Sequence, residues 1–472
     1  MDFDVVVIGA GPGGYIAAIR AAQLGFKVAC VDKFTRNGKY ALGGTCLNVG
    51  CIPSKALLQS SENFAELNHS FKDHGISCDN PKIDIKKMLE RKEEIINKNT
   101  QGISFLFKKN KVTEIHGLAS FKNNLNGKWI INVNDNGKNQ DLTSTHVIIA
   151  TGSIPRMLPQ IATDNKNILD NEGILDLNST PKNLCIIGAG VIGLEMGSVW
   201  ARVGSNVTIL EVADKFLPAA DEQVSKELAK HLQKQGLNIK NGVKITEIKS
   251  TAKQVKVKYE LNNEINEITC DKLMVAIGRV PNTQELNAKE VGLNIDDRGF
   301  ILVDEECKTN LTNIWAIGDC VRGPMLAHKA SEEGIIVAER IAGEHPHFDF
   351  NTVPWVIYTN PEIAWVGKTE QQLKDAGISY KKGSANFLAN GRALGLGNNK
   401  GFVKILACEE TDRILGVHMV GPFVSELITE AVVAMEFKAS SEDLARIIHA
   451  HPSLSEVIHE AALACDKRQL HG

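Results

Sequence analysis

The sequence predicts an α/β fold with two similar nucleotide-binding domains and a third, α+β domain at the C-terminus. Three observations support this prediction: a glycine pattern that occurs twice, a turn-rich alternating segment after each copy, and the end of the glycine-rich pattern near residue 350. With 472 residues, of which 43% are hydrophobic, the chain is long enough for about three domains.

The glycine pattern is G-x-G-x-x-G, and each copy lies between a strand-like run and a helix. The two copies, "VVVIGAGPGG" and "LCIIGAGVIG", hold Gly9, Gly11 and Gly14, and Gly188, Gly190 and Gly193. Glycines let the backbone turn tightly and approach a pyrophosphate, while the helix N-terminus supplies amides and partial positive charge. Each copy therefore predicts a Rossmann-like dinucleotide-binding domain.

An acidic residue ends the next strand-like run in both copies. Asp32 follows Gly9 by 23 residues (32 − 9), and Glu211 follows Gly188 by the same 23 (211 − 188). A carboxylate at this position accepts hydrogen bonds from ribose hydroxyls. A single motif can also be only a tight strand-to-helix turn, with its carboxylate in solvent. Two copies with matched spacing and matched acidic ends favour two dinucleotide sites.

A meander of alternating residues follows each glycine motif. Asparagine and glycine pairs between strand-like runs are hairpin signals. The pairs are Asn126-Gly127, Asn136-Gly137 and Asn262-Asn263, within residues 112–148 and 243–277. Each meander ends in an apolar strand that closes on a glycine, Gly152 in "VIIATGS" and Gly278 in "LMVAIGR". We therefore predict three-stranded β-meander insertions in both nucleotide-binding domains.

The pattern changes beyond about residue 350, where Pro354 and Pro361 mark the boundary. Apolar residues at helical spacing then recur near 424–438 and 454–465. This part of the chain is the predicted α+β domain.

The segment "GGTCLNVGCIPSK" places Cys46 and Cys51 five positions apart. Pro53 suits the first position of a helix, so Cys51 is expected at or beside that helix's N-terminus, where the dipole stabilises a thiolate. Five residues of regular helix rise about 7.5 Å, so a disulfide needs a bent segment, which Asn48 and Gly50 permit. Two unpaired structural cysteines are the alternative. No second Cys or His pair at zinc-like spacing is near, so we expect no metal.

Charge and composition exclude several classes of partner. The net charge is −3 and the pI is near 6.5, which leaves no basic face for nucleic acid. The N-terminal residues lack a basic region and a cleavage site, and no apolar run approaches the roughly 18 residues of a membrane span. The sequence therefore predicts a cytoplasmic protein without nucleic-acid or membrane partners.

Several motifs together resemble one enzyme family. They are "GAGPGG", "GGTCLNVGCIPSKALL", "ATGS", "GAGVIGLE", "AIGRVPNT", "AIGDC", "MLAHKASEEG" and "HAHPSLSE". The chain resembles the pyridine nucleotide-disulfide oxidoreductases and, over its whole length, their dihydrolipoamide dehydrogenase branch, the E3 flavoproteins of 2-oxo acid dehydrogenase complexes. This resemblance implies FAD at the first dinucleotide site and NAD at the second. Electrons would pass from dihydrolipoamide through a Cys46–Cys51 disulfide to FAD and then to NAD.

The resemblance also assigns catalytic roles. Cys46 would be the thiol that meets substrate sulfur, and Cys51 the thiolate that contacts the flavin. His451 with Glu456 would be the base, brought to the disulfide from the partner subunit of a homodimer. A histidine with a near-neutral pKa can take a proton from a thiol, and a carboxylate on its other nitrogen fixes the tautomer. Without the resemblance, a structural role for His451 would be the better interpretation.

Further residues are assigned to the cofactors by the same resemblance. Lys55 and Glu195 would lie near the flavin N5, although a solvated helix lysine and a helix-start glutamate are the alternatives. Asp319 would accept from a ribityl hydroxyl, unless it only forms a turn, and Ala327 lies in a stretch that meets flavin through its backbone. The remaining cofactor residues are Gly9, Gly11, Gly14, Asp32 and Gly152 for FAD, and Gly188, Gly190, Gly193, Glu211 and Gly278 for NAD.

The implied domains are an FAD-binding domain (1–153), an NAD-binding domain (154–280), a second part of the FAD-binding domain (281–349) and a dimerisation domain (350–472). The implied partners are a second copy of the chain, lipoyl domains and the E2 subunit-binding domain. The sequence leaves open which 2-oxo acid complexes are served.

Other functions remain as alternatives. A single C-terminal cysteine, Cys465, argues against mercuric reductases and large thioredoxin reductases, which carry a further pair there. Glutathione reductases typically have Pro-Lys-Lys where this chain has Pro53-Ser54-Lys55, and an NADPH-dependent reductase of that kind is the second candidate. A subunit that chiefly docks to a complex is the third. The segment "FLANGRALGLG" (387–397) has no explanation from the sequence.

Overall fold

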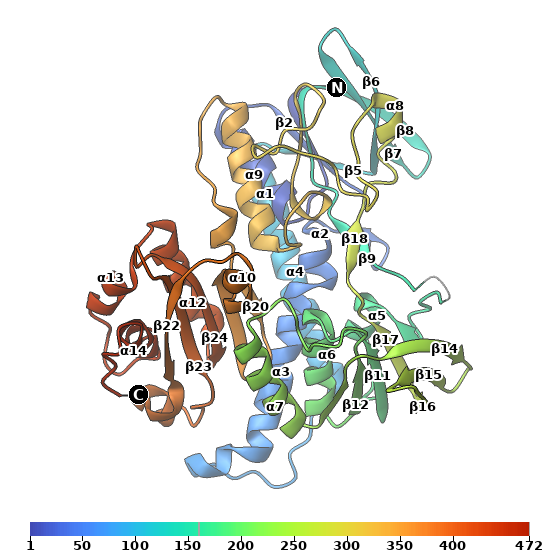
Figure 1. The fold of residues 1–472 in the computed structure, drawn as a ribbon. Coiled ribbons are helices and arrows are strands. Elements are labelled where there is room, and N and C mark those ends of the chain that lie inside the picture. The colour runs from blue at the N-terminus through green and yellow to red at the C-terminus, as the bar shows by residue number, and fades with distance from the viewer. Residues whose placement is uncertain (159–160, 472) are drawn as a thin grey trace. The chain divides into compact units, whose positions relative to one another are not determined.

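The computed structural model describes residues 1–158 and 161–471, which form two compact units (Figure 1). Unit 1 comprises Met1–Ala56, Lys86–Met157 and Ile277–Phe348, and unit 2 comprises Leu57–Ile85, Leu158–Ala276 and Asp349–Gly472. Among the described residues, no helix combines the length and the apolarity of a membrane span.

Unit 1 is built on a parallel sheet. Its strands lie in the order β5 (Thr113–His116), β2 (Val28–Asp32), β1 (Asp2–Ile8) and β8 (Lys138–Ile149), and β19 (Ile314–Ala316) pairs with β8. Val5, Val6 and Val7 of the central strand are fully buried, as expected for a parallel strand covered on both faces. A long helix α4 (Ile85–Asn110) also belongs to this unit.

Two helices of unit 1, α1 (Pro12–Gln23) and α9 (Ala327–Ile341), lie side by side (Figure 1). Glycines permit this approach: a Cβ on Gly13 would lie 2.9 Å from the carbonyl oxygen of Ala330, and one on Gly334 would lie 2.5 Å from that of Gly13. The close contact fixes the turn that precedes α9 against the sheet.

The first meander extends this same sheet. Strands β6 (Leu118–Leu125) and β7 (Lys128–Asp135) pair in sequence with β8, which is long enough to pair with β7 on one side and with β1 on the other. The turn residues Asn126, Gly127, Asn136 and Gly137 all have positive φ (53°, 82°, 50° and 89°). These values match the hairpin turns that the sequence predicts.

Unit 2 repeats the parallel sheet. Its order is β10 (Ile168–Leu169), β17 (Lys272–Val275), β11 (Asn183–Ile187), β12 (Asn206–Leu210) and β13 (Leu237–Lys240). Helix α6 (Val191–Arg202) follows β11 as α1 follows β1, and α7 (Glu222–Lys234) joins β12 to β13. The second meander, β14 (Lys244–Ser250), β15 (Val255–Leu261) and β16 (Glu264–Cys270), forms a separate sheet, unlike the first. The predicted α/β fold with two Rossmann-like domains is confirmed.

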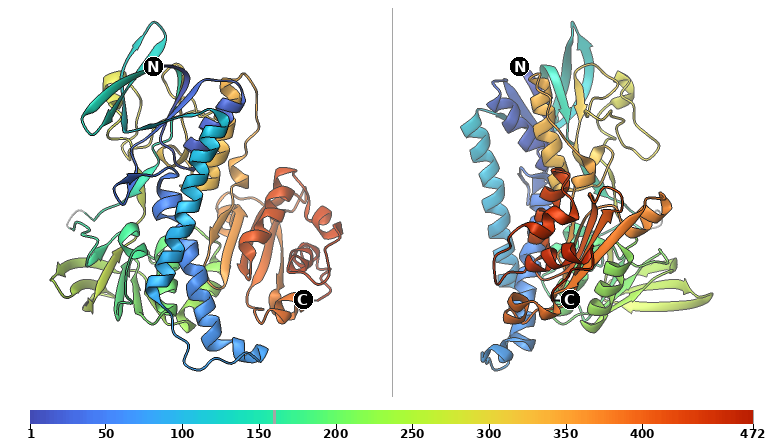
Figure 2. Two further views of the ribbon diagram at one scale, coloured as in Figure 1. Left: turned by 180° about the vertical axis from the view of Figure 1, so that it is seen from behind. Right: turned by 60° about the vertical axis from the view of Figure 1, so that its left-hand side comes forward.

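The C-terminal part of unit 2 has an antiparallel sheet in the order β20 (Trp355–Ile357), β21 (Glu362–Gly367), β24 (Ile414–Gly421), β23 (Phe402–Cys408) and β22 (Tyr380–Asn386). Helices α12 (Val424–Glu436) and α14 (Glu456–Ala464) share one core with a face of this sheet, and Figure 2 shows this part in orange and red. Both helices lie where apolar spacing predicts them, and α13 (Ser441–Arg446) joins them.

Shorter elements complete the two units. They are β3 (Thr35–Arg36), β4 (Lys39–Tyr40), β9 (Ser153–Pro155), β18 (Arg279–Pro281) and α8 (Ala288–Val291) in unit 1, and α5 (Asn171–Leu175) and α10 (Glu370–Asp375) in unit 2.

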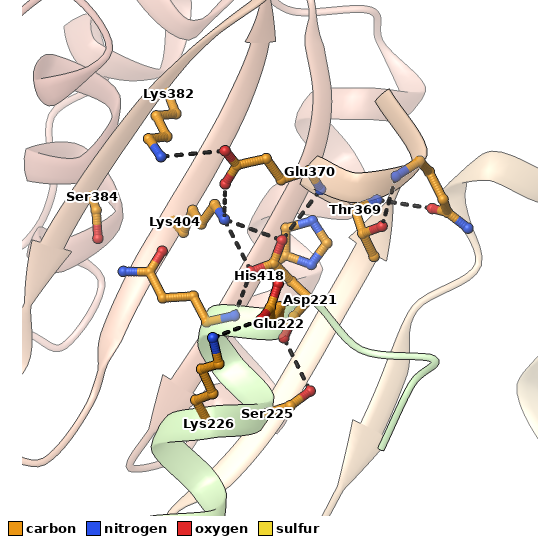
Figure 3. A network of polar contacts seen from close by, with 12 residues as sticks. Asp221, Glu222, Ser225, Lys226, Thr369, Glu370, Lys382, Ser384, Lys404 and His418 are labelled. Atoms are coloured by element: carbon orange, nitrogen blue, oxygen red, sulfur yellow. Dashed lines mark hydrogen bonds and ion pairs between the residues drawn. The ribbon is translucent and has the colours of Figure 1, made fainter. Parts of the chain in front are cut away.

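A buried ion-pair network covers the other face of the C-terminal sheet (Figure 3). Residues alternate along strands, so Lys404 and His418, which are partners in the strand register, point away from the helical core. The Lys404 Nζ lies 2.9 Å from Asp221 Oδ1 and 2.6 Å from Glu370 Oε2. Asp221 is also the N-cap of α7. One buried ammonium group thus joins the sheet to α7 and α10.

The environment sets the charges of this network. Burial alone would raise the pKa of Glu370, but hydrogen bonds from Lys404, Tyr380 and Lys374 hold it far below its ordinary value. Burial lowers the pKa of His418 to about 4. The imidazole is therefore neutral at pH 7, and its Nε2 donates to the Lys368 carbonyl oxygen at 3.0 Å.

We expect Lys404→Met to lower the free energy of unfolding by about 3–5 kcal/mol, because it leaves the buried carboxylate of Asp221 without a cation. Lys382→Met is the matched control, since Lys382 contacts the same Glu370 at 3.3 Å but is 57% exposed. It should cost under about 1 kcal/mol. Urea unfolding followed by circular dichroism measures both, and equal losses would contradict this description of the network.

His418 should make stability depend on pH between about 6.5 and 4. The unfolded chain takes up a proton as the pH falls below about 6.5, whereas the folded histidine resists until about pH 4. Stability is therefore lost as the pH falls through this window, by on the order of 3 kcal/mol. His418→Gln, which cannot titrate, should flatten this slope relative to the parent chain. Identical slopes in urea midpoints from pH 7 to 4.5 would contradict the prediction.

Candidate active site

The two cysteines of "GGTCLNVGCIPSK" flank a break between helices. Helix α2 (Gly44–Val49) ends at Gly50, whose φ and ψ are −142° and −117°, and α3 (Cys51–His69) begins at Cys51. A Cβ on Gly50 would lie 2.9 Å from the Thr45 carbonyl oxygen, so the bend requires glycine. Pro53 is the third residue of α3 rather than its first. The missing N–H of proline is tolerated there, because the first four N–H groups of a helix have no acceptor within the helix. The bent segment is where the sequence predicts it, whereas the helix begins at Cys51, two residues before Pro53.

Asn48 has a different role from the one predicted. We expect a residue that permits the bend, but Asn48 lies within α2 and is fully buried. Its Nδ2 donates to the backbone carbonyl oxygens of Leu42 and Gly44, both at 3.0 Å. The backbone carbonyl oxygen of Asn48 accepts a hydrogen bond from the Arg36 guanidinium. Asn48 therefore anchors the short helix that presents Cys46.

The two cysteines have different environments, since Cys46 is half-buried and Cys51 is exposed. Both residues are free thiols, and their side chains hydrogen bond to each other. This hydrogen bond and burial raise the pKa of Cys46 well above its ordinary value. The thiol of Cys46 therefore tends to keep its proton, and Cys51 lies at the helix start, where the dipole favours a thiolate.

The first glycine motif has a distinct geometry at each glycine. Gly9 has a φ of +103°, which makes the tight turn. A Cβ on Gly14 would lie 1.8 Å from the Gly9 carbonyl oxygen, so helix and strand pack closely there. A Cβ on Gly11 would meet nothing within 4 Å. That open side is where a pyrophosphate can approach.

The second motif repeats this geometry. Gly188 has a φ of +106°, and a Cβ on Gly193 would lie 2.1 Å from its carbonyl oxygen. A Cβ on Gly190 would meet nothing within 4 Å. Both turns therefore fit a dinucleotide pyrophosphate, and the sequence repeat is a repeat of structure.

The cysteine segment packs directly on the first glycine turn. The Gly43 N–H donates to the Ala10 carbonyl oxygen at 2.9 Å. A Cβ on Gly44 would lie 2.8 Å from the Gly11 Cα. Glycine is therefore needed at position 44 because two backbones meet there, and this contact places α2 beside the nucleotide turn.

Asp32 binds the same turn from the other side. Its Oδ2 accepts the Ala10 N–H at 2.6 Å, and its Oδ1 accepts the Phe34 N–H at 2.8 Å. Burial raises the pKa of Asp32, although both amides oppose this effect. The carboxylate thus fixes the turn and stands at the end of β2.

Glu211 makes the equivalent bonds in unit 2. Its Oε2 accepts the Ala189 N–H at 2.6 Å, and its Oε1 accepts the Ala213 N–H at 2.8 Å. The alternative of a carboxylate directed only to solvent does not hold in this structure. Both acidic residues lie at the carboxyl end of a parallel sheet, where α/β proteins bind ligands.

Three strand ends meet around Asp319. The Ser153 Oγ donates to Asp319 Oδ2 at 2.6 Å and accepts from Arg279 Nε at 2.7 Å. The same guanidinium reaches Thr45 Oγ1 at 3.4 Å, next to Cys46. The sequence prediction missed Ser153 and Arg279. Both directly follow a glycine that ends a strand-like run, and this was the available signal.

A buried ion pair holds the Asp319 turn. Lys329 and Glu333 are 3.3 Å apart and at most 1% exposed. Glu333 Oε2 accepts the Gly318 N–H at 2.7 Å, and Lys329 Nζ donates to the Gly318 carbonyl oxygen at 3.0 Å. Ala327 is the first residue of the same helix, α9, where backbone N–H groups have no partner within the helix.

Other predicted cofactor residues lie in different units. Lys55 is on α3, one turn after Cys51, in unit 1, and Glu195 is on α6 in unit 2. Glu195 is only 2% exposed and accepts the Tyr358 N–H at 3.2 Å, so it is no solvated helix-start residue. The expected proximity of Lys55 and Glu195 stays a prediction. Gly152 and Gly278 have φ of +68° and +104°.

The structure brings His451 and Glu456 together. The His451 Nδ1 lies 2.8 Å from Glu456 Oε1, and Glu456 Oε2 accepts the Ser453 N–H at 2.8 Å. Burial alone would raise the pKa of Glu456, but the Ser453 amide and the imidazole hold it below its ordinary value. The imidazole side chain is 80% exposed in the single chain. The carboxylate therefore holds the imidazole at Nδ1 while most of the ring stays exposed.

Comparisons with known proteins agree with these motifs. The family model described as pyridine nucleotide-disulphide oxidoreductase matches residues 3–334, and that family's dimerisation domain matches residues 353–462. A dihydrolipoyl dehydrogenase from Cupriavidus necator is 57% identical over 100% of this chain and 99% of its own. The mitochondrial dihydrolipoyl dehydrogenase of Pisum sativum is 47% identical over 99% of this chain and 92% of its own.

A solved structure supports the fold as well. The crystal structure of LpdA from Mycobacterium tuberculosis has a TM-score of 0.90 and 27% identity, and the match covers 97% of this chain and 99% of that one. The family resemblance is thereby confirmed. The chain belongs to the pyridine nucleotide-disulphide oxidoreductases.

Proposed function

We propose that this chain oxidises protein-bound dihydrolipoamide to lipoamide, with NAD⁺ as hydride acceptor, as the E3 component of a 2-oxo acid dehydrogenase complex. The observation that carries this proposal is the Cys46–Cys51 pair at the start of α3. Full-length relatives of the chain are named dihydrolipoyl dehydrogenases.

We assign FAD to the first glycine turn and NAD to the second. The open sides of Gly11 and Gly190 suit pyrophosphates, and Asp32 and Glu211 stand where adenine riboses lie in such folds. When bound, FAD would accept an electron pair from the reduced cysteine pair and supply hydride to NAD⁺. Residues 1–153 and 281–349 would then form the FAD-binding domain, 154–280 the NAD-binding domain and 350–472 the dimerisation domain.

The chain's own residues handle the thiol chemistry. A substrate thiolate attacks the oxidised pair at Cys46 and forms a mixed disulfide, which releases Cys51 as thiolate. The second substrate thiol then attacks the mixed disulfide, closes lipoamide and releases Cys46. Because the pKa of Cys46 is raised, its thiolate takes up a proton as it leaves. His451, held by Glu456 through Nδ1, takes the substrate's proton at Nε2 and supplies this one.

A homodimer would bring these parts together. The family's dimerisation domain spans residues 353–462, and His451 is exposed in the single chain. We infer that each subunit supplies His451 to the disulfide of the other, and that lipoyl domains and the E2 subunit-binding domain are further partners. A cytoplasmic location fits a chain whose cysteines are free thiols.

The wild-type chain tests the proposal directly. NAD⁺ reduction with free dihydrolipoamide should be rapid, whereas reduction of glutathione disulfide with NADPH should be slow. Faster glutathione reduction would favour the reductase alternative, and neither activity in an FAD-loaded chain would favour a docking subunit.

The first expected outcome concerns the cysteines. Cys46→Ser and Cys51→Ser should each abolish lipoamide turnover while FAD stays bound, because the glycine turn is intact in both. Only Cys51→Ser should also remove the long-wavelength absorbance of a thiolate beside oxidised flavin. Cys78→Ser changes an exposed cysteine and should leave turnover unchanged. If Cys46→Ser removed that absorbance and Cys51→Ser kept it, the two roles would be reversed.

His451→Gln should slow flavin reduction by dihydrolipoamide by about 10² or more, the usual effect of a positioned base. Flavin reduction by NADH should change little, because it needs no thiol deprotonation. His471→Gln is a matched control, since His471 forms a 2.8 Å pair with Glu460 and is 78% exposed. Stopped-flow measurement of both half-reactions decides, and equal slowing of the two would mean that His451 is structural.

Glu211 should select NAD over NADP. A carboxylate accepts from the ribose 2′-hydroxyl and repels a 2′-phosphate, so the preference in kcat/KM should be at least about 10²-fold. Glu211→Gln should shrink this ratio by about tenfold or more. Glutamine is preferred to alanine because its amide oxygen can still accept one of the two N–H groups, of Ala189 and Ala213, that the Glu211 carboxylate binds. An unchanged ratio would show that another residue selects the cofactor.

A further inference from the structure

The segment 387–397, "FLANGRALGLG", lies beside the helix that carries Glu456. It forms a short turn (Phe387–Ala389) and α11 (Gly391–Gly395). Phe387 and Ala393 are fully buried in one core cluster with Val457 and Ile458 of α14. The segment therefore shares a core with the first turn of α14, whose first residue is Glu456.

Asn390 connects this segment to the loop of the dyad. Its Oδ1 accepts the Ala393 N–H at 2.9 Å and so caps α11. Its Nδ2 donates to the Ser453 carbonyl oxygen at 2.9 Å. The two bonds fix the orientation of the amide, because one needs its oxygen and the other its nitrogen.

Ser453 continues the chain of bonds to the imidazole. Its N–H donates to Glu456 Oε2 at 2.8 Å, and Glu456 Oε1 holds His451 Nδ1 at 2.8 Å. The backbone of Ser453 is thus held on its carbonyl side by Asn390 and holds the carboxylate on its amide side. Capping of α11 requires only the Asn390 oxygen, so the Nδ2 bond serves the dyad loop.

We propose that Asn390 is a positioning residue for the His451–Glu456 base. It acts through Ser453, whose N–H it keeps directed at the Glu456 carboxylate. The inference rests on the proposed function, in which this dyad exchanges protons with thiols. It also gives a role to the segment 387–397.

The variant Asn390→Ser tests the bond to Ser453. Serine keeps an oxygen that can cap α11, but it has no Nδ2 to reach the Ser453 carbonyl. Flavin reduction by dihydrolipoamide should slow by about 3- to 10-fold, the usual range for one hydrogen bond, while flavin reduction by NADH stays unchanged. When this rate is plotted against pH, its decline on the acid side should move to lower pH. The reason is that protonated His451 loses part of its contact with the Glu456 carboxylate.

Asn399→Ser is the matched control. The Asn399 Nδ2 also donates to a backbone carbonyl oxygen in this segment, that of Leu388 at 3.2 Å, but the bond does not lead to the dyad. This variant should keep the wild-type rate and pH profile. Equal slowing by Asn399→Ser and Asn390→Ser would overturn the inference, since the segment as a whole would then be responsible.

A double-mutant cycle separates positioning from general stability. If Asn390 acts through Glu456, then Asn390→Ser in a Glu456→Ala background should slow the half-reaction by less than about twofold. The same slowing in both backgrounds would overturn the inference. If Glu456→Ala and His451→Gln left the half-reaction unchanged, the proposed base itself would fail. If those two slowed it and Asn390→Ser did not, only the role of Asn390 would fall.

Discussion

The peptide groups of Ala10 are the junction on which the candidate site of unit 1 depends. Its N–H donates to Asp32 at 2.6 Å, and its carbonyl oxygen accepts from Gly43 at 2.9 Å. One residue of the glycine turn therefore binds both the acid expected at a ribose and the segment that carries the cysteines. The nucleotide turn is joined to the segment that carries the cysteines by the backbone hydrogen bond from Gly43 to Ala10, which no side-chain substitution removes directly.

The same principle is used once in each unit. Ala189 donates to Glu211 as Ala10 donates to Asp32, with the same 2.6 Å separation. Close packing of the third glycine on the first holds the following helix against the sheet, so the amides at its N-terminus face the open side of the turn. The repeat of a short sequence motif thus corresponds to a repeat of individual hydrogen bonds.

Local patterns explain what the sequence predicts well. The glycine turns, the paired Asn-Gly hairpins and the start of α3 at Cys51 depend on neighbours within a few residues, which the sequence displays side by side. Such features are set by backbone conformation, and residue type at one position is enough to indicate them. The pairing of His451 with Glu456 is different, because the prediction rests on the family resemblance and not on a local pattern, although the two residues are close in sequence.

Long-range polar contacts explain what the sequence does not predict. Lys404 has the appearance of an ordinary strand lysine, and its partner Asp221 is 183 residues away. The Ser153 bond to Asp319 spans 166 residues, and the Asn390 bond to Ser453 spans 63. Each partner is common on protein surfaces, so nothing local distinguishes it from a solvated side chain. Only the packing of sheets and helices reveals that these groups are brought together.

An anaerobic single-turnover measurement tests the central claim, the route of electrons through the cysteine pair, most directly. One equivalent of dihydrolipoamide added to the FAD-loaded wild-type chain should produce the long-wavelength absorbance of a thiolate beside oxidised flavin. NAD⁺ added next should discharge that absorbance and yield one equivalent of NADH. Flavin bleaching without the absorbance, or lipoamide formed without NADH, would contradict this account.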